Sequence, residues 1–282
     1  MQPSYQSGFY APGRGVAKHP ELWRGCVGAW NPGLGNTGLS LRDWSGNQNN
    51  GTLTNGPTWD VSDGRQSLSF DGVDDWIELG TPSSLYCTTF TLSAWITPVL
   101  QNNNKYAAIM GNADLAYNHA NYVMNMWRSG SSDGNKAFAQ GEFGGTWYTV
   151  TDTTVLVTRA LTHIASTYNG SMLSIYRNGV KTASIAASGT PTTAGSNYRI
   201  GRTGLYPIYP ATPSSTDVTW SGLMSDIFIH NRALSPSQIQ TLATRPGIAY
   251  ELAPRKTYFI PTSTSTSQFY DILSPLIFAG TN

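Results

Sequence analysis

The chain has 282 residues, of which 12% are charged, compared with about 25% in an average soluble domain, so its polar surface is mostly uncharged. Its formal net charge is +1 and it has no run of lysine or arginine, which excludes the electrostatic pattern of a nucleic-acid-binding protein. We expect neither export nor membrane insertion, because the N-terminus lacks an apolar core and the apolar stretch near the C-terminus contains Asp271 and Pro275.

The two cysteines, Cys26 and Cys87, have no neighbouring cysteine or histidine at metal-ligand spacing. This spacing argues against a metal site built on them. Two alternatives stay open, a disulfide between neighbouring strands and two buried thiols, and the absence of a signal peptide favours the thiols.

The stretch Ser69–Leu79, SFDGVDDWIEL, combines four acidic residues with an Asp-Gly pair and a tryptophan. Asp71 and Gly72 suit a turn, because aspartate accepts backbone N–H groups and glycine tolerates positive φ. Catalysis by Asp71, Asp74 and Asp75 would need carboxylates facing each other across a cleft about 5 to 9 Å wide. Residues three or four apart in one hairpin lie along its rim instead. We therefore interpret this acidic stretch as a structural turn between two strands.

Residues 89–96 alternate in polarity, which is the pattern of a strand with two different faces. One face carries the apolar side chains Phe90, Leu92, Ala94 and Ile96. The other face carries Thr91, Ser93 and Trp95. The pattern predicts a half-buried strand.

Two Asn-Gly pairs, Asn169–Gly170 and Asn178–Gly179, lie nine positions apart between segments rich in β-forming residues. Asn-Gly tolerates positive φ at both central residues of a type I′ turn, so this region predicts a meander of three strands. His163 and His230 fall in predicted strands and show no ligand spacing, which favours hydrogen-bonded sheet residues over catalytic bases.

One short helix is expected after Ser235, which suits an N-cap. Proline follows at the first helical position and glutamine at the third, and Ile239 and Leu242 lie on one face. The helix should end before Pro246. Elsewhere short strands and long loops rich in Gly, Asn and Ser indicate an all-β sandwich or jelly roll.

Seven motifs extend this reading, and in chain order they are CVGAWNPG, LRDWSGNQNNGTL, LSFDGVDDWIELG, FTLSAWITP, HIASTYNGSMLSIYRNGVKTAS, YRIGR and GLMSDIFIHNRALSPSQIQTLA. Their order resembles the laminin-G-like, concanavalin A-like jelly-roll domain over residues 24–245. The resemblance implies an all-β fold of two antiparallel sheets in a jelly-roll sandwich, with one short helix near the C-terminal end of the domain. Residues 1–23 and 246–282 would form N-terminal and C-terminal arms.

The resemblance does not by itself imply a function, because this fold hosts lectins, adhesion modules, structural caps and a few glycanases. Its glycanase members carry Glu-x-Asp-x-x-Glu on one strand, and this sequence has no such element. We therefore expect no enzymatic activity.

The resemblance also implies a calcium site. The loop Asp43–Gly51, DWSGNQNNG, offers hard oxygen donors and glycines that let carbonyls converge, as Ca²⁺ requires. In calcium-bearing relatives a similar loop pairs with an aspartate of the last strand, the position that Asp226 has here. Asp43, Asn47 and Asp226 would then be side-chain ligands of a structural Ca²⁺, and a chelator would lower the melting temperature. The alternative is a hydrogen-bonded Asx loop.

Aromatic residues are frequent in the predicted loops. Their flat faces suit stacking on sugar rings, with nearby Asn and Asp for the hydroxyls. The candidates are Tyr117, His119, Trp147, Tyr148, Tyr206 and Tyr209. The alternative is that these rings pack against the sandwich or a neighbouring subunit. Glycan binding is expected to be weak per site and to act through linked copies, which raise affinity by about 10² to 10⁴.

The C-terminal arm ends with the apolar segment FYDILSPLIF, which is too short to fold alone and too apolar to leave in water. We expect it to be buried on a partner, either further copies of the chain in a homo-oligomer or other proteins of the assembly. A chain ending at Arg245 is expected to fold as a soluble monomer and to lose this assembly.

Together these features resemble a virion surface protein, because decoration and fibre proteins of tailed phages often use this domain. The prediction is a non-enzymatic structural protein of the virion surface, with binding of host-surface glycans as an added activity. The alternative is an exported bacterial carbohydrate-binding or adhesion module at the cell surface.

Overall fold

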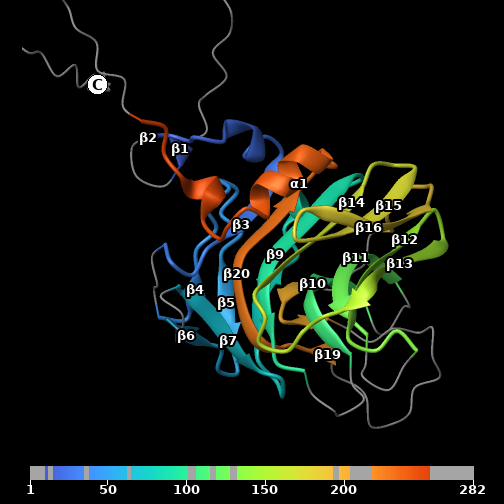
Figure 1. Ribbon diagram of the computed structural model, residues 1–282, viewed down its shortest axis with the longest axis horizontal. Helices are drawn as coiled ribbons and strands as arrows, with labels where there is room; N and C mark the ends of the chain where they lie inside the picture. Colours follow the sequence, from blue (N-terminus) through green and yellow to red (C-terminus); the bar gives the residue numbers. More distant parts are fainter. Residues whose placement is uncertain are drawn as a thin grey trace, which may run out of the picture.

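The computed structural model describes residues 10–11, 15–34, 38–61, 65–100, 106–114, 119–127, 132–192, 197–203 and 218–254. Within them, two large antiparallel sheets pack face to face (Figure 1). The first sheet has the strand order β16 (Val180–Ala186), β15 (Met172–Arg177), β14 (Thr162–Tyr168), β9 (Phe90–Pro98), β20 (Ser221–His230), β7 (Ser67–Asp71) and β6 (Thr58–Asp60), and β3 (Cys26–Trp30) also pairs with β20.

The second sheet has the order β13 (Thr146–Val155), β12 (Lys136–Phe143), β11 (His119–Met126), β10 (Ala107–Asp114), β17 (Tyr198–Ile200), β8 (Trp76–Gly80), β5 (Gly51–Thr54) and β4 (Ser40–Leu41). Two small ribbons join β1 (Tyr10–Ala11) to β2 (Gly15–Val16), and β18 (Arg202–Thr203) to β19 (Val218–Thr219). Within the described ranges the only α-helix is α1 (Pro236–Leu242), beside the 3-10 turns η1 (Pro20–Leu22), η3 (Ser83–Leu85) and η4 (Ile248–Tyr250). The predicted all-β sandwich with one short helix is confirmed.

The main core lies between the two sheets and is rich in aromatic rings. The ring of Phe143 stacks on that of Tyr168 with centroids 4.1 Å apart, and Phe90 lies 4.7 Å from Tyr122. Trp30 and Trp220 are fully buried. Such aromatic contacts add to the free energy of burial, so this layer holds the sandwich closed.

A second apolar layer covers the outer face of the first sheet. It joins residues of η1, β3, β14, β20 and α1, including Leu22, Trp23, Phe228, Ile239 and Leu242. Strand β9 is therefore buried on both faces, whereas its alternation predicted a half-buried strand. The reason is that α1 covers its polar face, where the Trp95 indole N–H donates to the Leu242 carbonyl at 3.2 Å.

The predicted meander is confirmed as β14, β15 and β16, but its two turns differ. Asn178 and Gly179 both have positive φ, at 48° and 82°, and form the expected two-residue connection. At the other turn Gly170 has a positive φ of 96°, while the side chain of Asn169 accepts the N–H groups of Ser171 and Met172. This connection is one residue longer, because the asparagine side chain caps it.

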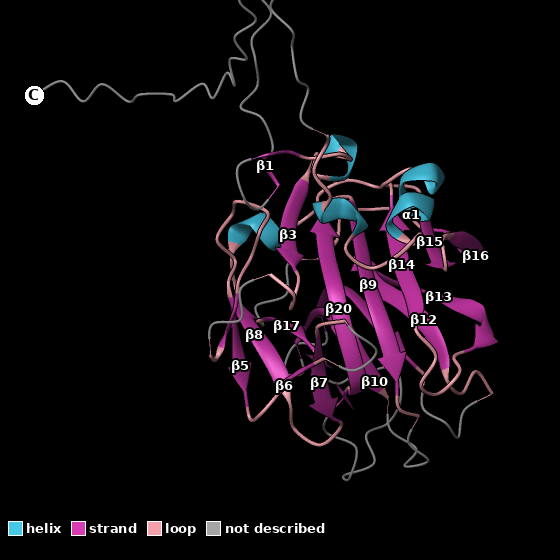
Figure 2. Ribbon diagram, turned by 60° about the vertical axis from the view of Figure 1, so that its left-hand side comes forward, coloured by secondary structure: helices cyan, strands magenta, loops and turns pink. Residues whose placement is uncertain are grey.

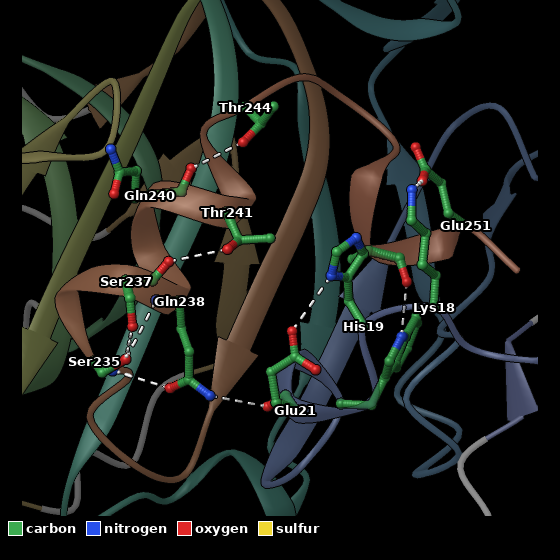
Figure 3. Close-up of polar contacts among 12 residues, drawn as sticks. Lys18, His19, Glu21, Ser235, Ser237, Gln238, Gln240, Thr241, Thr244 and Glu251 are labelled. Carbon is green, nitrogen blue, oxygen red and sulfur yellow. Dashed lines mark hydrogen bonds and ion pairs between the residues drawn. The ribbon is translucent and has the colours of Figure 1, made fainter. Parts of the chain in front are cut away.

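Helix α1 begins as the sequence predicts. The Ser235 hydroxyl accepts the N–H of Gln238, and the Gln238 side chain accepts the N–H of Ser235, which forms a capping box (Figure 3). The Gln238 amide also donates to the Glu21 carbonyl at 3.3 Å, so the cap ties the helix to the N-terminal segment.

The folded unit extends beyond the predicted range 24–245 at both ends. Trp23 is buried and its indole N–H donates to the carbonyl of Ala249, which is also buried. Beside them Lys18 pairs with Glu251, through a 2.8 Å ion pair and a backbone hydrogen bond (Figure 3). Contacts between residues more than 200 positions apart leave no local pattern, so the sequence placed these segments in the arms.

The molecule has two different ends. At one, which we call the arm end, residues 16–18 lie beside residues 251–253 through backbone hydrogen bonds. Strand β20 runs from the opposite end, the loop end, where Ser221 pairs with Asp71, to the arm end, where His230 pairs with Cys26 (Figure 2). The turn at Asp71–Asp75 therefore lies at the loop end.

Cys26 and Cys87 are both buried free thiols, which is the alternative that the sequence favoured. None of the helices in the described part of the chain is long and apolar enough to cross a membrane.

Candidate functional site

The outer face of the second sheet, which points away from the first sheet, carries polar and aromatic side chains from strands that are distant in sequence. The register places Gln140 beside Val123 and Thr149, and Arg199 beside Gly111 and Glu78. Several polar side chains of this face are buried, namely Asn125, Gln140 and Glu142. Buried amides and carboxylates are used in contacts within the protein, so these side chains order the face and do not reach solvent.

Three rings form a cluster on this face, which we call the ring platform: Tyr106, Trp127 and Phe138. Trp127 stacks on Phe138 with centroids 4.4 Å apart and an interplanar angle of 29°, and Tyr106 lies 5.6 Å from Trp127. The Trp127 indole N–H donates to the Thr151 hydroxyl at 3.0 Å, which fixes the ring. Tyr106 and Trp127 are partly exposed, whereas Phe138 is buried beneath them.

The ring platform lies toward the loop end. Trp127 directly follows β11, which runs toward the loop end. The backbone N–H of Trp127 donates to the backbone carbonyl of Lys136, at the start of β12. The neighbouring Asn125 amide donates to the Thr203 hydroxyl at 3.4 Å. This contact connects the platform to the ribbon of β18 and β19.

A second group on the same face, which we call the arginine patch, consists of Trp76, Glu78, Arg199 and Arg202. The Arg202 guanidinium lies over the Trp76 ring at 4.4 Å from its centroid, and that of Arg199 lies at 5.9 Å. The Arg199 Nε donates to Glu78 Oε2 at 3.0 Å. All four side chains are partly exposed, so charged donors and acceptors reach solvent around the indole.

The aromatic residues predicted as sugar contacts do not form one group. Trp147 and Tyr148 are adjacent on β13 and therefore point to opposite faces. Tyr148 stacks on core residue Phe143, at 5.7 Å, as the packing alternative proposed. Trp147 lies on the outer face opposite Glu142, in the half nearer the arm end. His119 opens β11, and Tyr117, Tyr206 and Tyr209 lie outside the described residues.

The ring platform and the arginine patch were missed from the sequence. The rings of Tyr106 and Trp127 do flank loops rich in Asn, Gly and Ser, and this signal was available. Their approach to each other depends on the pairing of β10, β11 and β12, which the sequence did not specify.

The predicted calcium loop is a hydrogen-bonded Asx loop centred on Asp43. Asp43 is buried, and its Oδ1 accepts the N–H groups of Ala29 and Ser45 at 2.9 and 2.8 Å. Its Oδ2 accepts the Ser45 hydroxyl at 2.7 Å and the Asn49 N–H at 2.9 Å. Four donors use the lone-pair directions that a carboxylate offers. The Asn47 amide donates to Ser45 and Cys26, so these residues do not fit a calcium shell.

Asp226, the third predicted calcium ligand, binds other parts of the chain than Asp43 does. Its Oδ1 accepts the Asn31 amide at 2.9 Å and the Gly247 N–H at 2.8 Å, which ties β20 to the segment after α1. Burial raises the pKa of Asp226 to about 6, although these hydrogen bonds lower it. Its φ of 47° is left-handed, a conformation that aspartate and asparagine tolerate better than most residues.

We expect removal of divalent cations to leave the melting temperature unchanged, because the oxygens of Asp43 already accept four protein donors. Thermal melts with and without EDTA, after prior dialysis against calcium, measure this. A fall of several degrees that calcium restores would instead show an ion bound by the folded state.

Asp226→Asn is expected to stabilise the protein at pH 8. The raised pKa of Asp226 means that its stabilising contribution is full below about pH 4 and is lost as the pH rises through about 6. Asparagine keeps the accepting oxygen without the charge, so the gain at pH 8 is on the order of 2 kcal/mol and disappears near pH 4. Melting curves from pH 4 to 8 test this. A loss of stability at pH 8 would indicate that the charge has a partner, such as a cation.

The acidic turn holds its carboxylates close together, with ligand oxygens of Asp71, Asp74 and Asp75 within 4.8 Å of one another. Each carboxylate accepts a hydrogen bond from the protein. Asp71 accepts the Val73 N–H at 2.7 Å, and Asp75 accepts the Asp71 N–H at 2.9 Å. Asp74 accepts the side-chain amide of Asn55. The structural interpretation of this stretch is confirmed.

The two strand histidines are buried sheet residues, as predicted. His163 Nε2 lies 2.8 Å from the Ser93 hydroxyl beneath α1, and His230 Nε2 lies 2.7 Å from the Leu22 carbonyl. Burial lowers the pKa of His163 to about 3 and that of His230 to about 4. Neither ring reaches solvent, so neither can serve a substrate as a base.

Comparison with known proteins places this fold. A family model described as the concanavalin A-like lectin/glucanases superfamily matches residues 71–240, and no curated protein sequence matches the chain. Among solved structures, the binding domain of Paraclostridial Mosquitocidal Protein 1 is 15% identical with a TM-score of 0.58, over 79% of this chain and 52% of that one. The chain thus spans about half of that domain.

Two further structures show the same fold. Domain 4 of an extracellular arabinanase from Geobacillus stearothermophilus, in complex with arabinotriose, is 18% identical with a TM-score of 0.58, over 78% of this chain and 98% of that one. The Trypanosoma rangeli sialidase in complex with sialic acid is 18% identical with a TM-score of 0.53, over 78% of this chain and 33% of that one. Because the family match covers more than half of its residues, the chain belongs to the concanavalin A-like lectin/glucanase superfamily.

Proposed function

We propose that the protein is a non-enzymatic carbohydrate-binding domain that binds glycans on the outer face of its second sheet, near the loop end. The observation that carries the proposal is the ring platform, in which two partly exposed rings, Tyr106 and Trp127, rest on buried Phe138. A rigid, partly exposed aromatic surface suits the apolar face of a sugar ring. The arabinanase domain, solved with arabinotriose, shares the fold and supports this proposal.

Binding is favoured over hydrolysis by the spacing of the carboxylates on this face. Glu78 on β8 and Glu142 on β12 are separated by four strand intervals, or about 19 Å at the usual strand spacing. Glycosidic bond cleavage needs two carboxyl groups about 5 to 9.5 Å apart. This pair is too widely spaced to act on one glycosidic bond.

We further propose that the domain acts on a virion surface, as a decoration or fibre protein held to other copies or proteins by its terminal arms. The described ends of both arms lie together at the arm end, opposite the ring platform. Attachment there would turn the platform outward, toward a host surface. An exported bacterial adhesion module would use the same face, and the identity of co-purifying chains distinguishes the two settings.

The experiment that tests glycan binding compares Trp127→Ala with Trp147→Ala, two tryptophans on the same sheet face. Loss of an aromatic anchor should weaken binding by at least about tenfold for Trp127→Ala, whereas Trp147→Ala, outside the platform, should change it by less than about twofold. A multivalent form on a broad glycan array and calorimetry with each hit measure this, with melting temperatures as the control for folding. Equal losses for both variants, or a blank array, would contradict the proposal.

A further inference from the structure

The four edge strands of the two large sheets are not protected alike. β13 and β16 lie on one side of the molecule, and β4 and β6 lie on the other (Figure 1). An unprotected edge strand can pair with another chain, which proteins commonly prevent with short strands, bulges, lysine or proline. β4 has two residues, β6 has three, and β16 carries the exposed Lys181 with a bulge beside it. Three of the four edges are therefore protected.

β13 is the unprotected edge. It is ten residues long and contains neither lysine nor proline. Over residues 146–151 it pairs with β12 without a register shift, and its side chains there are uncharged. A regular, uncharged stretch of this kind has the form that strand pairing requires.

The turn before β13 determines which backbone groups of the strand face outward. The two residues before Thr146 are glycines with φ of 58° and 80°, and Thr146 pairs with Phe143, as in a two-residue hairpin closed by a hydrogen-bonded pair. Hydrogen-bonded pairs alternate along an antiparallel ladder, so the N–H and C=O groups of Thr149 and Thr151 point away from β12. Within the described part of the chain, no backbone hydrogen bond other than those between paired strands reaches these groups.

We infer that β13 joins two copies of the chain, by antiparallel pairing of Thr149 with Thr151 of the second copy and of Thr151 with Thr149 of that copy. Each pair would exchange two hydrogen bonds and set two threonine side chains beside each other, which is a favourable cross-strand contact. A second copy supplies the same uncharged stretch in the matching direction. The pairing also ends at two copies, because it uses both β13 strands and leaves only the two-residue β4 strands at the ends of the joined sheet.

Pairing would set the two proposed binding faces side by side. Strands that pair antiparallel about a two-fold axis keep the same face of the sheet on the same side, so the outer faces of both copies would point in one direction. The Trp127 indole of the ring platform donates to the Thr151 hydroxyl, so each platform contacts the paired strand. Two linked platforms would bind a repetitive glycan more tightly than one. This consequence rests on the proposed function, whereas the pairing itself does not.

Sedimentation velocity and amide hydrogen exchange of the full chain test the pairing. Between about 5 µM and 1 mM the protein should show a monomer–dimer equilibrium with a micromolar dissociation constant, because one pair of strands buries less area than a standard interface. The amides of Thr149 and Thr151 should exchange at least about tenfold more slowly at the highest concentration than at the lowest. The amide of Lys181, which lies on the protected edge, should exchange at the same rate throughout.

Thr149→Pro should abolish the dimer. Proline is tolerated at an edge position whose N–H faces outward, so the domain should still fold. Lys181→Pro is the matched control, because Lys181 follows the pair of Arg177 and Val180 that closes another two-residue turn, and its N–H also faces outward. This control should leave the dimer unchanged.

A monomer at every concentration would overturn the inference. So would association without slower exchange at Thr149 and Thr151, because the arms or another surface would then join the copies. Slow exchange of these two amides in the monomer would show that another part of the chain covers the edge, and would also overturn it. If Thr149→Pro lowers the melting temperature strongly, the amide exchange of the unaltered protein decides. Glycan binding by a single ring platform stands or falls separately, on the comparison of Trp127→Ala with Trp147→Ala.

Discussion

A chain ending at Arg245 should be severely destabilised, whereas a chain ending at Pro254 should melt like the full protein. The shorter chain loses the buried residues Ile248 and Ala249, and the Trp23 indole N–H loses its acceptor. It also exposes Asp226, whose carboxylate accepts the Gly247 N–H. It also loses the ring of Tyr250, which contacts those of Trp23 and Phe228. Together the loss of the Ile248 side chain, of the Trp23 hydrogen bond and of these two ring contacts is worth about 4 kcal/mol or more.

For a domain of this size 1 kcal/mol corresponds to about 2–4 °C, so the melting temperature should fall by roughly 10 °C or more. Differential scanning calorimetry of the two shortened chains measures the difference. This outcome would replace the expectation from the sequence that the chain ending at Arg245 folds normally, and it makes Pro254 the correct end point for testing the C-terminal arm in assembly. Equal melting of the two chains would show that η4 contributes little.

Arg177→Met should strongly destabilise the protein, although the Arg177 side chain reaches the surface. Asp152 on β13 is 1% exposed, and Arg177 of β15 pairs with it across the two sheets at 3.5 Å. Within the described part of the chain neither carboxylate oxygen of Asp152 has a hydrogen bond, so removal of Arg177 leaves a buried charge without compensation. Breaking a buried pair in this way destabilises proteins by about 3–5 kcal/mol.

A double variant and a matched control make this prediction specific. Arg177→Met combined with Asp152→Leu should recover most of the loss, because two apolar side chains can pack where the ion pair was. Lys136→Met breaks the pair with Asp133, whose members are more exposed, and should change stability by less than about 1 kcal/mol. Urea denaturation of the four proteins measures this, and a double variant no better than Arg177→Met would mean that the guanidinium bonds to Thr154 and Val155 matter more.

The parts of the fold that could be predicted depend on neighbours in sequence. The capping box at Ser235, the turn at Asn178–Gly179 and the Asp71 turn are each complete within a few residues. The same holds for the alternation in β9, which identified its core-facing side chains correctly. Its other face was misjudged only because the covering helix comes 140 residues later.

The site depends on contacts that no local pattern contains. The pairing of β8, β17, β10 and β11 places Trp76 and Trp127 on one sheet face. A one-residue change of register would move each of these side chains to the other face. The calcium loop shows the same dependence on distant contacts: its oxygen-rich composition suits an ion, but the donors to Asp43 include the N–H of Ala29, on another strand.

The ribbon at the arm end determines how the domain responds to mechanical load. Residues 16–18 and 251–253 run antiparallel, and the Ala253 N–H donates to the Val16 carbonyl near the last described residue of the chain. A force that pulls residue 16 away from residue 253 would therefore break these hydrogen bonds one at a time, first the one at Val16 and then the one at Lys18. Tension applied to both ends together from a single attachment point would load neither bond. A pair of arms fixed to one site can thus tether the domain firmly, whereas arms fixed far apart would peel its first and last segments from the sandwich.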